Sequence, residues 1–126
     1  MKFVFDEEKA TQAAALLLER AGGELNYMKL LKLLYLADRQ AFIESGYPIT
    51  GARMVSMDCG PVLSEVYNLI TTQSESQSFW QVAITPQTNY TVRLQCQRGQ
   101  DRLSRFDRET LAAVWDRFGG MDLSGS

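Results

Sequence analysis

The sequence predicts an α+β fold, a mainly helical domain around a central buried helix with a small antiparallel β-hairpin or short sheet. Apolar residues recur at helical spacing in four segments, and in residues 27–44 they cover an arc too wide for a surface helix. Two short segments after residue 79 alternate in the manner of strands. We expect one domain over residues 1–126, because neither half alone would bury enough surface.

The first helix is expected at about residues 7–21. Asp6 is the predicted N-cap, and Glu7 and Glu8 suit the positive end of the helix dipole. Gly22 and Gly23 end the helix. Its apolar stripe consists of Ala10, Ala13, Ala14, Leu17, Leu18 and Ala21, and the small side chains predict close approach to a neighbouring helix.

The second helix is expected at about residues 27–44, with Asn26 as its N-cap. A helical wheel gathers Lys29, Lys32, Leu36, Arg39 and Gln40 on one side. The opposite arc is broad and apolar, so this helix should pack on more than one neighbour. The arc consists of Tyr27, Leu30, Leu31, Leu34, Tyr35, Ala37, Ala41 and Phe42.

Asp38 falls in the middle of that apolar arc, between the directions of Leu34 and Phe42. A buried carboxylate is unfavourable unless it is paired or accepts several hydrogen bonds. The expected partners are Arg53 or backbone N–H groups at the start of the next helix. We therefore expect Asp38 to be structural and to hold the second and third helices together.

Residues 49–58 are expected to be irregular or to hold a short extended piece. The third helix is predicted at about residues 61–71, because Pro61 suits a first helical position and Gly60 tolerates an unusual entry. Its expected inner face comprises Val62, Leu63, Val66, Tyr67 and Ile70. The polar segment 71–78 reads as an exposed loop.

Residues 80–85 and 90–96 are predicted to be the two strands of a hairpin, joined by residues 86–89. A lone hairpin is marginally stable, so it must pack on the helices or gain a third strand. Ser104 opens the last helix, with Asp107 completing a capping box, and Gly119 ends it. Its stripe comprises Leu111, Val114, Trp115 and Phe118.

Composition argues against several kinds of chemistry. The chain has no histidine, and its two cysteines, Cys59 and Cys96, are far apart, so we expect no catalytic imidazole, no metal site and no cofactor. A net charge of −2 does not favour nucleic-acid binding. No apolar stretch is long enough to span a membrane or, beside Asp6, Glu7 and Glu8, to form a signal peptide, so we expect a cytoplasmic protein.

Two ordered motifs resemble the Panacea domain, the SocA-like antitoxin domain that also occurs in phage-associated proteins. The family pattern is roughly K-L-x-K-L-L-Y-x-A-D, followed after a loop by G-P-V and a nearby aromatic residue. The chain matches it in order and spacing at Lys29, Leu30, Lys32, Leu33, Leu34, Tyr35, Ala37, Asp38, Gly60, Pro61, Val62 and Tyr67. A preceding helix and a closing Ser-capped helix that ends in Phe-Gly agree with the family.

The chain also departs from the family pattern. Met57, Asp58 and Cys59 precede the Gly-Pro, where many members carry alanine or a tryptophan-bearing sequence. Members often continue past the Phe-Gly with a segment that carries histidine and tryptophan, whereas this sequence stops at Ser126. It is therefore expected to be either a short member or one that lacks the C-terminal segment.

The resemblance implies an antitoxin that neutralises a cognate toxin by direct protein contact. The family prototype also delivers its toxin to a protease, so a protease or chaperone is a further partner that the resemblance implies. The alternative function is a phage- or mobile-element-associated adaptor that binds a host protein or delivers cargo to a protease. An enzyme that uses Asp38 or Cys59 is disfavoured, because no second acid, metal ligand or base accompanies Asp38 in sequence and Cys59 has no histidine or nearby lysine.

The predicted partner-binding residues are Lys29, Lys32, Tyr35, Arg39 and Arg53, with a solvated helix face as the alternative for the three cations on the second helix. Tyr35 could instead lie in the core, and Cys59 is expected to be inert. The structural motif comprises Leu34, Tyr35, Asp38, Gly60, Pro61, Val62 and Tyr67.

Overall fold

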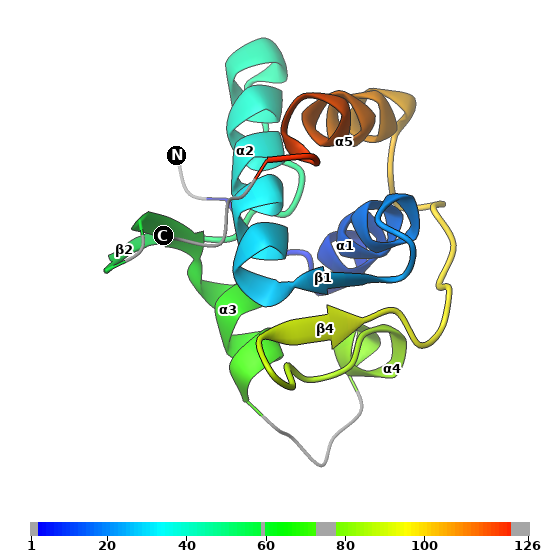
Figure 1. Ribbon diagram of the computed structural model, residues 1–126. Coiled ribbons are helices and arrows are strands. Elements are labelled where there is room, and N and C mark those ends of the chain that lie inside the picture. The colour runs from blue at the N-terminus through cyan, green and yellow to red at the C-terminus, as the bar shows by residue number, and fades with distance from the viewer. Residues whose placement is uncertain (1–2, 59, 73–77, 122–126) are drawn as a thin grey trace.

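The computed structural model describes residues 3–58, 60–72 and 78–121. Five helices and two small antiparallel sheets make up this part of the chain (Figure 1). The predicted α+β class, mainly helical around a central helix, is therefore confirmed. In chain order the elements are α1 (Glu7–Arg20), β1 (Glu24–Asn26), α2 (Tyr27–Ser45), β2 (Met54–Met57), β3 (Gly60–Leu63), α3 (Ser64–Thr71), α4 (Phe79–Ala83), β4 (Thr91–Arg93) and α5 (Arg105–Phe118).

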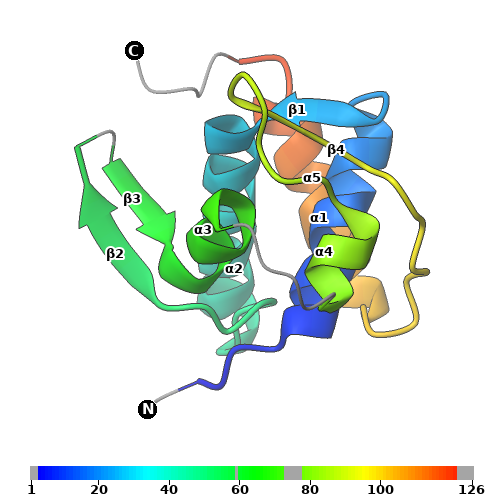
Figure 2. The same cartoon turned by 90° about the horizontal axis from the view of Figure 1, so that it is seen from below.

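Helix α2 lies at the centre of the molecule, with α1 and α5 on one side and the β2–β3 sheet and α3 on the other (Figures 1 and 2). The leucines and alanines of its apolar arc are buried as predicted, whereas Tyr27 and Tyr35 are half-buried. Leu33, which the wheel did not place in the arc, is also buried. Phe42 was wrongly assigned to this arc, because its side chain is 51% exposed. The fully buried leucines of α2 are Leu30, Leu31, Leu33 and Leu34.

The three predicted N-caps are confirmed. Asp6 accepts a hydrogen bond from the Lys9 backbone N–H at 3.0 Å, and Asn26 accepts one from that of Met28 at 2.8 Å. Ser104 and Asp107 form the complete capping box of α5. Asp107 also pairs with Lys9 at 3.1 Å, so the start of α5 is tied to α1.

The third helix begins three residues later than predicted, at Ser64. Gly60–Leu63 is instead strand β3, which pairs antiparallel with β2 from Met57↔Gly60 to Met54↔Leu63. The Ser64 N–H then donates to the Arg53 carbonyl at 2.7 Å, which continues the ladder. The Gly-Pro pair therefore enters a strand, because pairing with β2 overrides the preference of proline for a first helical position.

The first arm of the predicted hairpin is also wrong, since residues 79–83 form helix α4. Trp80, Ala83 and Ile84 are buried, a spacing that fits a helix turn, and Ser78 caps it. The second arm is correct in part, because β4 pairs with β1 and an isolated bridge joins Ile84 to Leu94. The turn itself lies at Asn89 and Tyr90, both with positive φ, between Thr88 and Thr91.

Two predictions fall partly on residues outside the described part of the chain. They are the exposed loop at 71–78, of which 73–77 are not described, and the inert Cys59. Among the described residues, no helix is both long and apolar enough to cross a membrane.

Candidate partner-binding surface

Asp38 is buried and is held by the loop that follows α2, through Thr50 and the backbone of Ile49. Its side chain is 6% exposed, and it accepts hydrogen bonds from the Thr50 backbone N–H at 2.9 Å and from the Thr50 hydroxyl at 2.5 Å. The predicted partners, Arg53 and the start of the next helix, are therefore wrong. Asp38 ties α2 to the chain just before β2 rather than to α3.

Burial dominates the electrostatics of Asp38. Removal of the carboxylate from water raises its pKa from 3.8 to about 6, although the hydrogen bonds from Thr50 act in the opposite direction. A salt bridge would have lowered the pKa instead. Asp38 is thus a structural acid held by neutral donors, with a pKa close to the physiological range.

Lys32 brings the two sequence motifs into contact. Its ammonium lies 3.4 Å from the Pro61 carbonyl, and a Cβ atom added to Gly60 would stand 2.5 Å from Lys32 Nζ. Gly60 also has a φ of +110°, which other residues rarely adopt. The backbone therefore requires a glycine at this position, and the lysine end lies directly over it. Lys32 fastens β3 to α2.

Lys29 fastens α2 to the end of α5. Its ammonium donates to the Gly119 carbonyl and lies 5.7 Å from the ring centroid of Trp115. A cation is favourable at this place, because the last carbonyls of a helix carry partial negative charge. Lys29 and Lys32 thus have contacts within the chain, and their predicted role in partner binding stays a prediction.

The other three predicted partner residues are spread over α2 and the start of β2. Tyr35 is half-buried and packs against the core, whereas Arg39 is exposed. Arg53 is exposed, and its backbone N–H donates to Glu65 at 2.8 Å. Among the described residues, neither the Arg39 nor the Arg53 guanidinium forms an ion pair within 4 Å.

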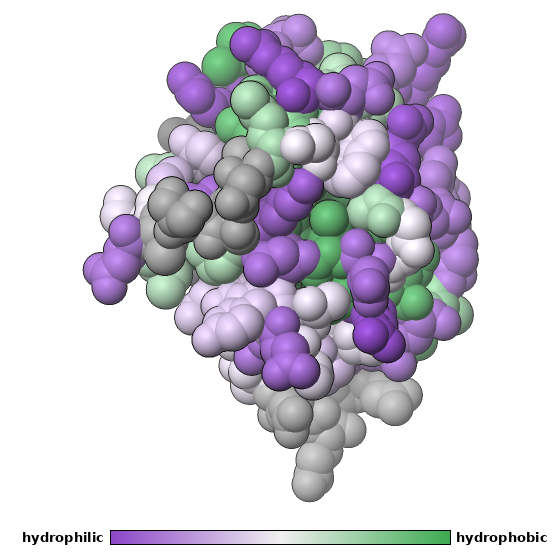
Figure 3. All heavy atoms as spheres, viewed as in Figure 1, coloured by the Kyte–Doolittle hydropathy of each residue, from purple (hydrophilic) through white to green (hydrophobic). Residues whose placement is uncertain are grey.

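Exposed hydrophobic side chains gather in a stretch that sequence reasoning did not single out. Six of the ten large hydrophobic residues that are exposed in the described structure lie between positions 42 and 57, at the end of α2 and along β2. Phe3 adds edge-to-face contacts with Phe42 at 5.8 Å and with Tyr47 at 6.2 Å. Figure 3 shows hydrophobic residues interspersed with hydrophilic ones on one face of the molecule. The six residues, called the 42–57 surface below, are Phe42, Ile43, Tyr47, Met54, Val55 and Met57.

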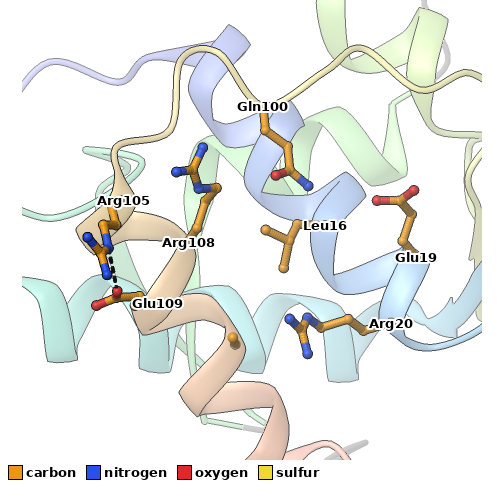
Figure 4. Close-up of a pocket in the computed structure, with 8 residues that line it drawn as sticks. Leu16, Glu19, Arg20, Gln100, Arg105, Arg108 and Glu109 are labelled. Atoms are coloured by element: carbon orange, nitrogen blue, oxygen red, sulfur yellow. Dashed lines mark hydrogen bonds and ion pairs between the residues drawn. The ribbon is translucent and has the colours of Figure 1, made fainter.

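A hollow of about 510 Å³ between α1 and α5 contains none of the predicted site residues. Arginines from both helices line it, and Arg105 pairs with Glu109 at 3.0 Å (Figure 4). Its other lining residues are Leu16, Glu19, Arg20, Gln100, Arg108 and Ala112, which include no cysteine or hydroxyl nucleophile. The described residues also contain no group of three or more acids and cysteines that could hold a metal ion.

These observations define a small α+β protein in which Lys29, Lys32 and Asp38 tie a central helix to its neighbours and exposed apolar residues are concentrated between positions 42 and 57. A family model described as antitoxin SocA-like, Panacea domain, matches residues 30–124. The chain belongs to this family, which confirms the resemblance and supports an antitoxin role and a toxin partner in general. No curated protein and no solved structure matches the chain.

Proposed function

We propose that this protein neutralises a cognate toxin by direct protein–protein binding through the 42–57 surface. The observation that carries the proposal is the concentration of exposed apolar side chains on this surface in a member of an antitoxin family. Exposed apolar residues in such number commonly mark interaction sites, and aromatic residues, methionine and arginine are the types enriched there. Arg39 and Arg53 supply exposed cations on α2 and beside β2.

The charge on α2 indicates the kind of toxin surface that fits. Helix α2 carries Lys29, Lys32 and Arg39, and of its two acids Asp38 is buried and Glu44 is exposed at the C-terminal end. The whole chain nevertheless has a net charge of −2, so this positive face is a local feature. An acidic surface on the toxin would complement it and accelerate association.

The proposed mechanism is masking, without catalysis. A complementary surface of about 800 Å² on each partner, with a few anchoring side chains, is enough for stable binding. We place the encounter in the cytoplasm, because the exposed free thiol of Cys96 fits a reducing compartment. Delivery of the bound toxin to a protease or chaperone would be a further step after the same contact.

Co-expression with the protein encoded beside this chain tests the proposal. We expect that protein to arrest growth alone and the wild-type chain to restore growth. Ile43→Glu and Met54→Glu should abolish rescue while leaving the fold intact, because both side chains are more than half exposed. Tyr90→Asn is the matched control, since Tyr90 is 68% exposed near the other end of α2.

Two results would contradict the proposal at different levels. A neighbouring protein that is harmless alone, or that stays toxic beside the wild-type chain, would overturn neutralisation. Rescue by Ile43→Glu and Met54→Glu as complete as that by Tyr90→Asn would overturn the 42–57 surface only. A pull-down that recovers a protease or host complex without any toxic neighbour would favour the adaptor function.

A further inference from the structure

Strand β2 has one open edge. Among residues 3–58, 60–72 and 78–121 it pairs with β3 on one side only, and β3 lies between it and the helices (Figure 2). All four of its residues are exposed. The other side of β3 is closed, because α2 packs against it and Lys32 contacts the Pro61 carbonyl.

The register shows which backbone groups face the open edge. Opposed residues in an antiparallel pair alternate between those that exchange hydrogen bonds and those that point outward. The bond from the Ser64 N–H to the Arg53 carbonyl sets the alternation, so Val55↔Val62 and Met57↔Gly60 are bonded pairs. Met54 and Ser56 therefore direct their N–H and C=O groups away from β3.

Pro61 agrees with this assignment. It lies opposite Ser56, a position at which neither residue donates to the other, so its missing N–H leaves no gap in the ladder. Its carbonyl points outward to Lys32, as the alternation requires. Among the described residues, no hydrogen bond reaches the outward backbone groups of Met54 or Ser56.

The residues of β2 do little to prevent another strand from pairing with its open edge. Natural edge strands are commonly protected by lysine, proline, a bulge or a covering segment. Residues 54–57 read Met-Val-Ser-Met, with no charge and no proline, and three of the four side chains are large and apolar. Within the described part of the chain, the shortness of β2 is the one such protection.

We propose that an extended segment of the toxin adds to β2 as a third strand, with its backbone bonded to Met54 and Ser56. This inference rests on the proposed function and specifies how the 42–57 surface is used. Backbone bonds supply affinity in this mode, and side chains such as Met54 and Val55 supply selectivity. The basic residues on α2 favour a segment that carries acidic residues outside the paired stretch.

A second copy of this chain is a poorer occupant than the toxin. Pairing of two β2 strands would involve four residues on each side. Stable complexes bury roughly 800 Å², about 20 to 30 residues, on each partner. A toxin that covers the 42–57 surface as well avoids this difficulty.

Backbone amide exchange in the wild-type protein, measured with and without the protein encoded beside it, tests the inference directly. The Met54 and Ser56 amides should exchange fast in the free chain and gain at least about tenfold protection in the complex. The Val55 and Met57 amides, which already bond to β3, are the internal reference. They should change less than the outward amides.

Ser56→Pro gives an independent test, because it removes an outward N–H that the hairpin does not use. Calorimetry should show that Ser56→Pro binds the protein encoded beside this chain at least about tenfold more weakly than wild type does. The variant lacks the backbone N–H donor of residue 56, and its proline ring obstructs the added strand. Ser56→Ala keeps the N–H and should bind within about twofold of wild type. If Ser56→Pro fails to fold, amide exchange in the wild-type complex decides.

The outcomes separate the two proposals. Wild-type binding with Met54 and Ser56 amides unprotected, or unaffected by Ser56→Pro, would overturn strand addition and leave neutralisation intact. A free chain that is dimeric, with these amides already protected, would assign the edge to a second copy and would also overturn it. Absence of wild-type binding would overturn the proposed function and this inference together.

Discussion

Both sheets of this protein have two short strands, but each strand of one buries a side chain in the core, whereas the other sheet has an exposed outer strand. In β1–β4, Leu25 lies opposite Val92, and both side chains are buried. The segment that precedes β4 covers this sheet, because the Thr85 N–H donates to the Arg93 carbonyl at 2.9 Å. In β2–β3, the outer strand has no buried residue and no covering segment in the described structure.

This difference separates a structural sheet from one that presents its edge. Strand β1 runs directly into α2, so its sheet is continuous with the core. The β2–β3 sheet is attached by side chains, through Asp38 to Thr50 before β2 and through Lys32 to β3. Because β3 and the chain just before β2 are both attached to α2, the outer strand β2 can remain exposed and available to a partner.

The largest expected effect is the pH dependence of the contribution that Asp38 makes to the free energy of unfolding. The folded pKa of Asp38, about 6, lies above the ordinary aspartate pKa of 3.8, so the folded state binds a proton more tightly than the unfolded state. The contribution of Asp38 is therefore most favourable below pH 4 and falls by about 3 kcal/mol as pH rises through 6. Asp38→Asn removes this titration, since an amide can still accept from the Thr50 N–H and donate to its hydroxyl.

Urea unfolding at pH 3.5 and pH 7.5 checks this prediction. The free energy of unfolding of Asp38→Asn relative to wild type should rise by about 3 kcal/mol between the two pH values. Other acids cancel in the comparison. An ion pair with Arg53 would give the reverse, a variant weakened at pH 7.5, and that outcome would show that the carboxylate is stabilised by charge.

The next prediction compares the loss of stability when a valine is truncated in each of the two sheets. Val92→Ala should lower the free energy of unfolding by about 2 to 3 kcal/mol, because it empties a fully buried site in the β1–β4 sheet. Val55→Ala, in a strand that is exposed throughout, should change it by less than about 0.5 kcal/mol. Equal losses in urea denaturation would mean that β2 is as structural as β4.

The sequence was informative where a few neighbouring residues decide the structure. Asp6, Asn26 and Ser104 were identified as caps because each bonds to a backbone N–H within three residues. The apolar arc of α2 was identified because helical spacing sets direction. A wheel does not say where neighbouring helices end, however, so Phe42 points in a core direction and is nevertheless exposed.

The errors arose where distant contacts decide. Gly60 and Pro61 suit a helix entry as well as a strand, and pairing with β2 together with contact to Lys32 selects the strand. The partner of Asp38 was missed because Thr50 acts through a loop N–H and hydroxyl, for which the sequence contains no charge signal. The 42–57 surface was missed because exposure of apolar residues cannot be read from periodicity alone.

A smaller loss of stability is expected at the turn between the strands of the exposed sheet. Gly60→Ala should lower the free energy of unfolding by about 1 to 2 kcal/mol, because its φ of +110° is strained for alanine and its Cβ would meet Lys32. Gly120→Ala is the matched control, since nothing lies within 4 Å of the added Cβ. Equal loss of thermal stability in Gly60→Ala and Gly120→Ala would contradict the requirement for glycine at position 60.

The smallest effect is expected at the lysine that fastens β3. Lys32→Met keeps most of the apolar stem and removes the ammonium, so the free energy of unfolding should fall by about 1 kcal/mol. Arg39→Met, on the exposed side of the same helix, should leave it unchanged within about 0.5 kcal/mol. Amide exchange at Val55 and Met57 should accelerate only in Lys32→Met, because the hairpin then opens more readily from α2. If Val55 and Met57 exchange equally in both variants, the hairpin is held by burial of Val62 and Leu63 alone, and Lys32 remains available to a partner.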